Sequence, residues 1–167
     1  MVRTLKAEPL TAEAFAPYGD VIATLDHENQ FTINYGNTTR YHDMMKVDVA
    51  DEGGSPCVNI FRSHPLSQPI IIKLMERHPL GSQSFLPLGC ENPYLVVVAE
   101  AGELDLQKIR VFLAQPNQGV NYHKGVWHHF SLALGKTTDF LVIDRKGGGE
   151  NLEEYELPHA AQIVIQI

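Results

Sequence analysis

The chain has 167 residues, the length of one compact domain with a sizeable core, and we expect a single domain over residues 1–167. Its 20 acidic residues outnumber its 13 lysines and arginines, and the net charge of −7 argues against nucleic acid or a membrane surface as a partner. A small molecule is the expected partner. Only two cysteines occur, and no apolar run is long enough to span a membrane or direct export, so we expect a cytoplasmic protein.

One helix is predicted near the N-terminus, over residues 11–16, with Thr11 as its N-cap and Pro17 and Gly19 after its end. Beyond it, turn clusters rich in Gly, Pro and Asn separate short segments with strand character. The predicted strands are residues 58–61, 70–76, 84–88, 94–99, 110–114, 127–134, 139–143 and 162–167. Many short strands with one short helix predict a mainly β domain, folded as an antiparallel sandwich or barrel.

Three of the eight histidines, His123, His128 and His129, fall within seven residues. They belong to the segment 119–129, which places polar, titratable and aromatic groups in a turn that enters a strand. Imidazoles are the commonest metal ligands and general bases, so this segment is a candidate site. The alternative is a set of surface histidines beside a buried tryptophan.

A second candidate group lies between residues 74 and 87. On a strand, Glu76 and His78 project from the same face, and Gln83 follows after a turn. This order, continued by His128, resembles the cupin metal pattern, with Glu76 in place of a histidine, Gln83 in place of a carboxylate and His123 in place of a proline. Two nitrogen and two oxygen ligands suit a divalent first-row metal such as nickel, manganese or iron. The alternative is a cupin barrel whose metal site has decayed to a polar pocket.

Two further segments carry basic side chains. Arg40 and His42 offer a cation and an imidazole to a pocket, or belong to an ordinary loop. Arg62 shares a strand face with Ile60 and His64. If that face points into a barrel, Arg62 is suited to bind a carboxylate, whereas on the outer face it is a solvated charge.

With these groups in order, the chain resembles the ureidoglycolate lyase family. The segments that carry the resemblance are residues 10–22, 40–43, 76–81, 119–129 and 139–145, and the pairing of Gly-Val-Asn-Tyr-His with Val-Trp-His-His is the most specific part. The resemblance implies a cupin-like antiparallel β-barrel of jelly-roll type with a short N-terminal helix, and a homodimer. It also implies cleavage of (S)-ureidoglycolate to glyoxylate and urea in allantoin degradation.

This reaction moves protons and breaks a carbon–nitrogen bond, so no nucleotide or flavin cofactor is expected. A divalent metal such as nickel or manganese, held by Glu76, His78, Gln83 and His128, would lower the pKa of the substrate hydroxyl. The candidates for the acid and base are His42, His123 and His128. The candidates for binding the substrate carboxylate are Arg62, Arg40 and Lys124.

Two rival functions remain open at this point. One is another cupin enzyme, an isomerase or a dioxygenase, acting on a small hydroxy or keto acid. The other is a non-catalytic cupin that binds a metabolite, because a fold does not determine a function. Release of urea argues against an isomerase, and consumption of oxygen argues against a lyase.

Overall fold

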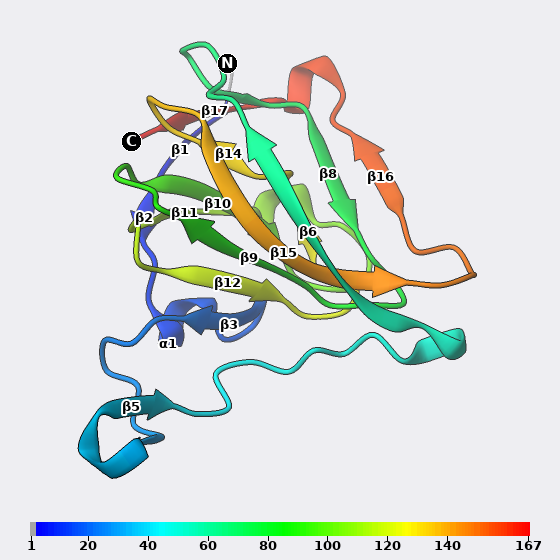
Figure 1. Ribbon diagram of the computed structural model, residues 1–167. Helices are drawn as coiled ribbons and strands as arrows, with labels where there is room; N and C mark the ends of the chain where they lie inside the picture. Colours follow the sequence, from blue (N-terminus) through cyan, green and yellow to red (C-terminus); the bar gives the residue numbers. More distant parts are fainter. Residues whose placement is uncertain (1–2) are drawn as a thin grey trace.

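The computed structural model describes residues 3–167, which form layered β-sheets (Figure 1). A five-stranded sheet packs against one face of a seven-stranded sheet, and a three-stranded sheet covers part of its other face. The predicted mainly β, cupin-like class with a short N-terminal helix is confirmed, and the strands of residues 3–167 are divided among sheets rather than joined in one closed barrel. No helix in this part of the chain is long and apolar enough to cross a membrane.

The sheets are built from short strands. The five-stranded sheet contains, in order, β3 (Gly19–Ile22), β12 (Gly119–Tyr122), β9 (Gln83–Leu88), β15 (Thr138–Lys146) and β6 (Ser55–Ser63). The seven-stranded sheet contains β16 (Glu153–Glu156), β8 (Leu74–Arg77), β13 (Trp127–His128), β10 (Tyr94–Ala99), β11 (Arg110–Ala114) and β2 (Glu8–Pro9), with β14 (Leu132–Ala133) also paired to β10. The three-stranded sheet contains β1 (Arg3–Lys6), β17 (Ile163–Gln166) and β7 (Ile71–Ile72).

Strand β10 is buried on both faces. Neighbouring side chains of a strand point to opposite faces, so its residues divide between two cores. Tyr94, Val96 and Val98 belong to the core between the five- and seven-stranded sheets. Leu95, Val97 and Ala99 belong to the second core, which also contains Ile163 and Ile165 of β17. Burial on both faces explains why this segment is an unbroken apolar run in the sequence.

The sequence predicts the central strands better than the peripheral ones. Strands β10 and β11 have the predicted bounds, and β6 and β15 extend beyond theirs. The predicted strand 127–134 is interrupted, because β13 and β14 pair separately with β10. Strand β12 was not predicted, since Asn121 breaks its apolar pattern, yet Asn121 is buried and donates hydrogen bonds to Asp20 and to the Lys46 carbonyl.

Helix α1 (Ala12–Phe15) fills the space beside β3 (Figure 1). The predicted N-cap is confirmed, because the Thr11 hydroxyl accepts a hydrogen bond from the Ala14 backbone N–H. Phe15 is fully buried and lies edge-on to Phe112, with ring centroids 5.7 Å apart. The short helix therefore contributes one large aromatic side chain to the core between the five- and seven-stranded sheets.

An arm leaves the body of the molecule after β3. It contains the hairpin of β4 (Gln30–Ile33) and β5 (Thr38–Tyr41), joined by the 3₁₀ turn Asn34–Gly36 and set apart below the sheets in Figure 1. The other 3₁₀ turns are Asp51–Gly53, Leu106–Lys108 and His159–Ala161. Phe31 of the arm is 44% exposed, so this hairpin buries little apolar surface within one chain.

We expect Phe15→Ala to lower the free energy of unfolding by about 3–5 kcal/mol, because it removes a fully buried ring and leaves a cavity. The matched control is Phe31→Ala on the arm, which should change it by less than about 1 kcal/mol. Chemical denaturation followed by circular dichroism measures both values. Equal losses in the two variants would contradict the role given to Phe15.

Candidate active site

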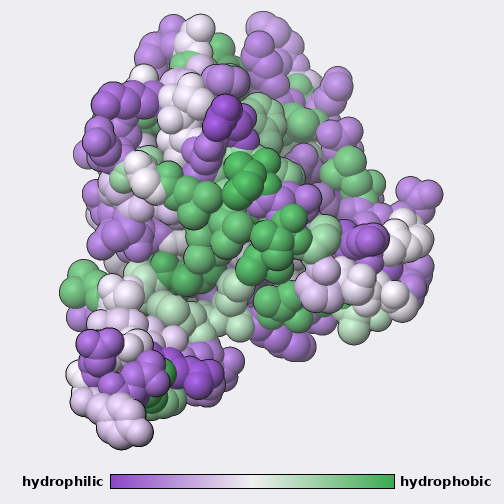
Figure 2. Space-filling view, viewed as in Figure 1, coloured by the Kyte–Doolittle hydropathy of each residue, from purple (hydrophilic) through white to green (hydrophobic). Residues whose placement is uncertain are grey.

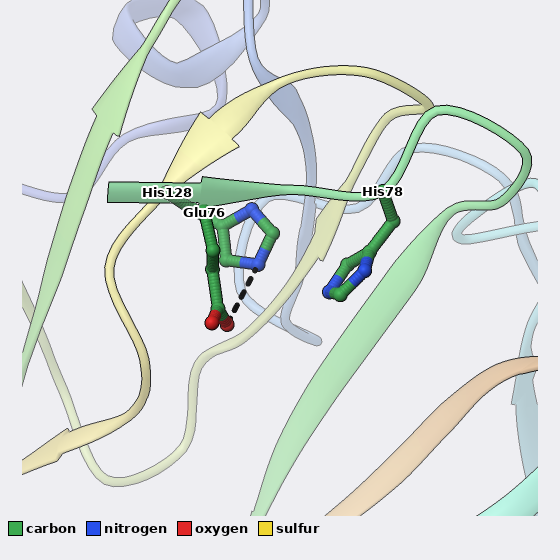
Figure 3. A group of neighbouring side chains, drawn as sticks. All are labelled: Glu76, His78 and His128. Carbon is green, nitrogen blue, oxygen red and sulfur yellow. Dashed lines mark ion pairs between the residues drawn. The ribbon is translucent and has the colours of Figure 1, made fainter. Parts of the chain in front are cut away.

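The candidate site begins with a cross-strand pair. Strands β8 and β13 are antiparallel, and Glu76 lies directly opposite His128. The two side chains therefore share one face of the sheet, where His128 Nε2 lies 3.6 Å from Glu76 Oε1 (Figure 3). His78, just beyond the end of β8, turns its ring toward the same place, and the His78 and His128 ring centroids are 5.2 Å apart. Ligand atoms from all three residues lie within 4.8 Å of one another.

Gln83 reaches the same group from the facing five-stranded sheet. Its Oε1 atom lies 3.2 Å from Nε2 of His78 and 3.2 Å from Nε2 of His128. Gln83 and His128 are both buried. The structure thus brings together Glu76, His78, Gln83 and His128, the four residues that the spacing in the sequence selected as metal ligands. We call these four residues the donor cluster.

Backbone carbonyls orient both imidazoles of the donor cluster. His78 Nδ1 donates to the Asn151 carbonyl at 2.7 Å, and His128 Nδ1 donates to the Val126 carbonyl at 3.1 Å. A neutral imidazole that donates from Nδ1 carries an unshared electron pair on Nε2. When both imidazoles are neutral, their Nε2 pairs face the oxygens of Gln83 and Glu76, and the cluster is then a convergence of acceptors. Such a set is suited to hold a cation, and the hydrogen-bonded Nδ1 atoms are the usual outer contacts of metal-binding histidines.

The electrostatics of the cluster keep its acid charged and one imidazole neutral. Burial opposes ionisation of Glu76, but His128 in its protonated form, through its hydrogen bond and charge, together with the charge of a protonated His78, outweighs burial and lowers the pKa of Glu76. Burial, followed by the nearby charge of His128, lowers the pKa of His78 below its ordinary value. An ionised carboxylate beside a neutral imidazole is the protonation state that binding of a metal ion requires.

Tyr122 holds the ring of His128 from the side of the five-stranded sheet. The two rings are stacked, with centroids 4.2 Å apart and planes 10° from parallel. Tyr122 also lies opposite Gln83 in the pairing of β12 with β9. Burial raises the pKa of its phenol, so the hydroxyl stays protonated. Tyr122 therefore fixes the plane of one imidazole without adding charge.

The turn between β12 and β13 connects the two histidine motifs. Gly125 adopts a left-handed conformation with φ of 76°, which favours glycine over residues with side chains. Its N–H donates to the His78 carbonyl at 2.9 Å. The backbone of one motif is thereby tied to the backbone of the other, which sets how far His78 lies from His128.

A cavity of about 310 Å³ gives access to the cluster. Its lining contains two members of the donor cluster, His78 and Gln83, together with Ser82, Asp144, Arg145, Glu150, Asn151 and Leu152. A larger hollow of about 490 Å³ is lined by Arg62, His64 and Asp139 among others, and it contains no member of the donor cluster. The smaller cavity is therefore the candidate substrate site.

The predicted residues of the segment 119–129 divide between the cluster and the surface. His123 is half-exposed, with its Nε2 atom 3.2 Å from Asp20. Lys124 forms ion pairs with Asp51 at 2.7 Å and with Asp48 at 3.3 Å. His129 lies in a different hollow, and burial lowers its pKa to about 4. Within this chain, His123 and Lys124 lie outside the donor cluster, and their catalytic and binding roles stay predictions.

The other predicted residues also lie apart from the cluster in a single chain. Arg62 projects to the solvent and forms a bidentate ion pair with Asp139, with hydrogen bonds of 2.8 and 2.9 Å. Arg40 and His42 belong to the arm, where both contact the ring of Phe31. Their proposed parts in binding and proton transfer stay predictions.

Three residues of the site carried no role in the sequence analysis. Tyr122 belongs to the candidate segment 119–129, but the sequence pattern does not predict its strand, β12. Asn151 acts through its backbone carbonyl on His78, an interaction that no sequence pattern signals. Asp144 lines the cavity from β15, and only the register of β15 against β9 brings it near Gln83. Strand pairing between distant segments is the common reason.

Known proteins resemble this chain over nearly its whole length. The family model described as ureidoglycolate lyase matches residues 2–164. A ureidoglycolate lyase of Burkholderia mallei (strain NCTC 10229) is 56% identical over 159 residues, which cover 95% of this chain and 92% of the relative. Those of Pseudomonas entomophila (strain L48) and Pseudomonas aeruginosa (strain LESB58) are 46% and 48% identical, and the alignments cover 98% of this chain and 98% and 96% of the relatives. The chain therefore belongs to the ureidoglycolate lyase family.

Proposed function

We propose that this protein is an enzyme that cleaves (S)-ureidoglycolate to glyoxylate and urea in purine degradation. The observation that carries the proposal is the convergence of Glu76, His78, Gln83 and His128 beside a cavity, in a chain whose relatives are named ureidoglycolate lyases. The cavity of about 310 Å³ suits a small substrate.

The reaction is an elimination that balances without an oxidant. The hydroxyl of the substrate loses its proton and becomes the aldehyde of glyoxylate, the carbon–nitrogen bond breaks, and the departing nitrogen gains a proton to complete urea. With both imidazoles neutral, the donor cluster offers the substrate hydrogen-bond acceptors, so it orients the hydroxyl with its proton toward the cluster. His42 and His123 are the proposed carriers of the two protons.

We propose further that the cluster holds a divalent metal ion, with nickel and manganese as the candidates. The residues fit this group, because two unshared imidazole pairs, an ionised carboxylate and an amide oxygen converge. Two nitrogen ligands favour a transition metal over magnesium or calcium. A bound ion would supply Lewis acidity that lowers the pKa of the substrate hydroxyl.

We expect the purified protein to release urea and glyoxylate from ureidoglycolate without added nicotinamide or flavin. Coupled detection of glyoxylate measures the rate above the spontaneous decay of the substrate, and an oxygen electrode should record no uptake. Oxygen consumption would favour a dioxygenase. Binding of substrate by a folded protein without turnover would favour a metabolite-binding protein and defeat the proposal.

We expect His78→Ala to lower both metal content and rate by about 100-fold or more, because it removes one ligand of the ion. His64→Ala is the matched control, since His64 is exposed and bonds to Thr137 away from the cluster. Elemental analysis and the glyoxylate assay are made on the same samples. Full activity in wild-type protein that chelation has freed of metal would show that the protein's own groups carry the reaction.

The proposed setting is the cytoplasm, with a homodimer as the working form and no nucleic-acid or membrane partner. The free thiols of Cys57 and Cys90 and the net charge of −7 support this setting. An apolar patch on the outer face of the five-stranded sheet supports the dimer (Figure 2). There Val58 and Ile60 of β6 are 64% and 55% exposed, and Ile60 lies opposite Leu141 of β15.

We expect Ile60→Asp to convert the dimer to a monomer, because it places a charge at the centre of the apolar patch. Leu25→Asp is the matched control, since Leu25 is exposed but lies outside the sheet. Light scattering coupled to gel filtration gives the mass of each variant. A wild-type monomer, or a dimer that survives Ile60→Asp, would contradict this use of the patch.

A further inference from the structure

A second polar group lies beside the donor cluster on the inner face of the five-stranded sheet. In the pairing of β15 with β6, Asp144 lies opposite Cys57, and Asn59 lies on the same face two residues further along β6. In the pairing of β15 with β9, Ile143 lies opposite Ser84, so continuing this register by one residue brings Asp144 beside Gln83. We call Asp144, Asn59 and Cys57 the Asp144 group.

The Asp144 group and the donor cluster face the same cavity. Asp144, Gln83 and His78 all line the space of about 310 Å³. The mechanism assigns no part to Asp144. A carboxylate beside a site for a negatively charged substrate repels the substrate carboxylate and attracts a hydrogen-bond donor.

One oxygen of Asp144 is held by its neighbours and the other is open. Oδ1 accepts hydrogen bonds from Asn59 Nδ2 at 3.0 Å and from Cys57 Sγ at 2.8 Å. Oδ2 forms no hydrogen bond or ion pair within residues 3–167, and no buried side-chain oxygen in this range lacks a partner, so Oδ2 is accessible to a ligand. The hydrogen bond to Asp144, followed by burial, raises the pKa of the Cys57 thiol, so the sulfur stays protonated as a donor.

We propose that Asp144, positioned by Asn59 and Cys57, binds the ureido group of the substrate. This inference rests on the proposed function and names the residue that selects the leaving group. A ureido group presents N–H donors on the two nitrogens that flank its carbonyl carbon, and the open Oδ2 of Asp144 can accept from them. Holding the ureido end at Asp144 directs the substrate hydroxyl toward the donor cluster. It also keeps the nitrogen of the breaking carbon–nitrogen bond close to the Asp144 carboxylate.

The test compares two ligands that each carry half of the substrate. Ureidoacetate has the ureido group and the carboxylate but no hydroxyl, and glycolate has the hydroxyl and the carboxylate but no ureido group. Calorimetric titration into the purified protein measures their affinities without turnover. We expect Asp144→Asn to weaken ureidoacetate by about tenfold or more, because it removes a charged acceptor. Glycolate should change by less than about twofold.

Two further variants keep the result interpretable. Glu156→Gln is the matched control, since Glu156 is an exposed carboxylate on β16 outside this cavity, and it should leave both affinities unchanged. Cys57→Ala removes one of the two donors to Asp144, and it should weaken ureidoacetate alone and by less than Asp144→Asn. Thermal unfolding confirms that each variant is folded.

The proposal is overturned if Asp144→Asn weakens both ligands equally, if it changes neither, or if the wild-type protein binds no ureidoacetate. These outcomes are distinct from failure of the proposed function, which shows as a lack of urea release in the glyoxylate assay. If the protein binds ureidoacetate through Asp144 but releases no urea, the ureido subsite is supported and the proposed lyase activity is wrong.

Discussion

Two-sided burial of β10 is the constraint on which the rest of the structure depends. Alternate side chains of this one strand enter two different cores, so its position relative to both neighbouring layers is fixed by packing on each face. The strands that pair with β10 are positioned by their hydrogen bonds to it. β13 has only two residues and is held between β10 and β8, with His128 opposite Val98 on one side and Glu76 on the other. The precision of the candidate site therefore originates in an apolar strand that contributes no group to it.

The polar groups of the site are placed where an apolar core ends. Val98 and Tyr122 belong to the core between the five- and seven-stranded sheets, and the donor cluster follows directly beyond them. Burial of unshared electron pairs is unfavourable unless a proton or an ion satisfies them, so this arrangement favours binding of a cation. The backbone carbonyls of Val126 and Asn151 maintain the orientation of the two rings that creates this preference.

Prediction from the sequence succeeded where a local pattern reflects a local cause. The apolar run of β10, the cap of α1 and the two-residue spacing of Glu76 and His78 could all be recognised from neighbouring residues. The grouping of this pair with Gln83 and His128 rests on the resemblance of their order along the chain to the cupin metal pattern, and the structure brings the four together. The positions of Tyr122 and Asp144 could not be predicted in this way, because they depend on registers between strands that lie far apart in the sequence. The same limitation applies to Arg62, since its outward direction follows from the face that β6 turns to the core.

The parallel pairing of β1 with β17 has a consequence for the synthesis of the protein. Arg3 lies opposite Ile163, so β1 cannot pair until β17, which lies 160 residues further along the chain, has been made. During translation the growing chain can assemble β10 and β11 while the core beneath them still lacks Ile163 and Ile165. The apolar face of β10 and β11 is thus uncovered on the ribosome until β17 emerges, and contacts of such wide sequence separation form slowly. The interval between emergence and closure is the stage at which this chain is most open to capture by chaperones or to aggregation.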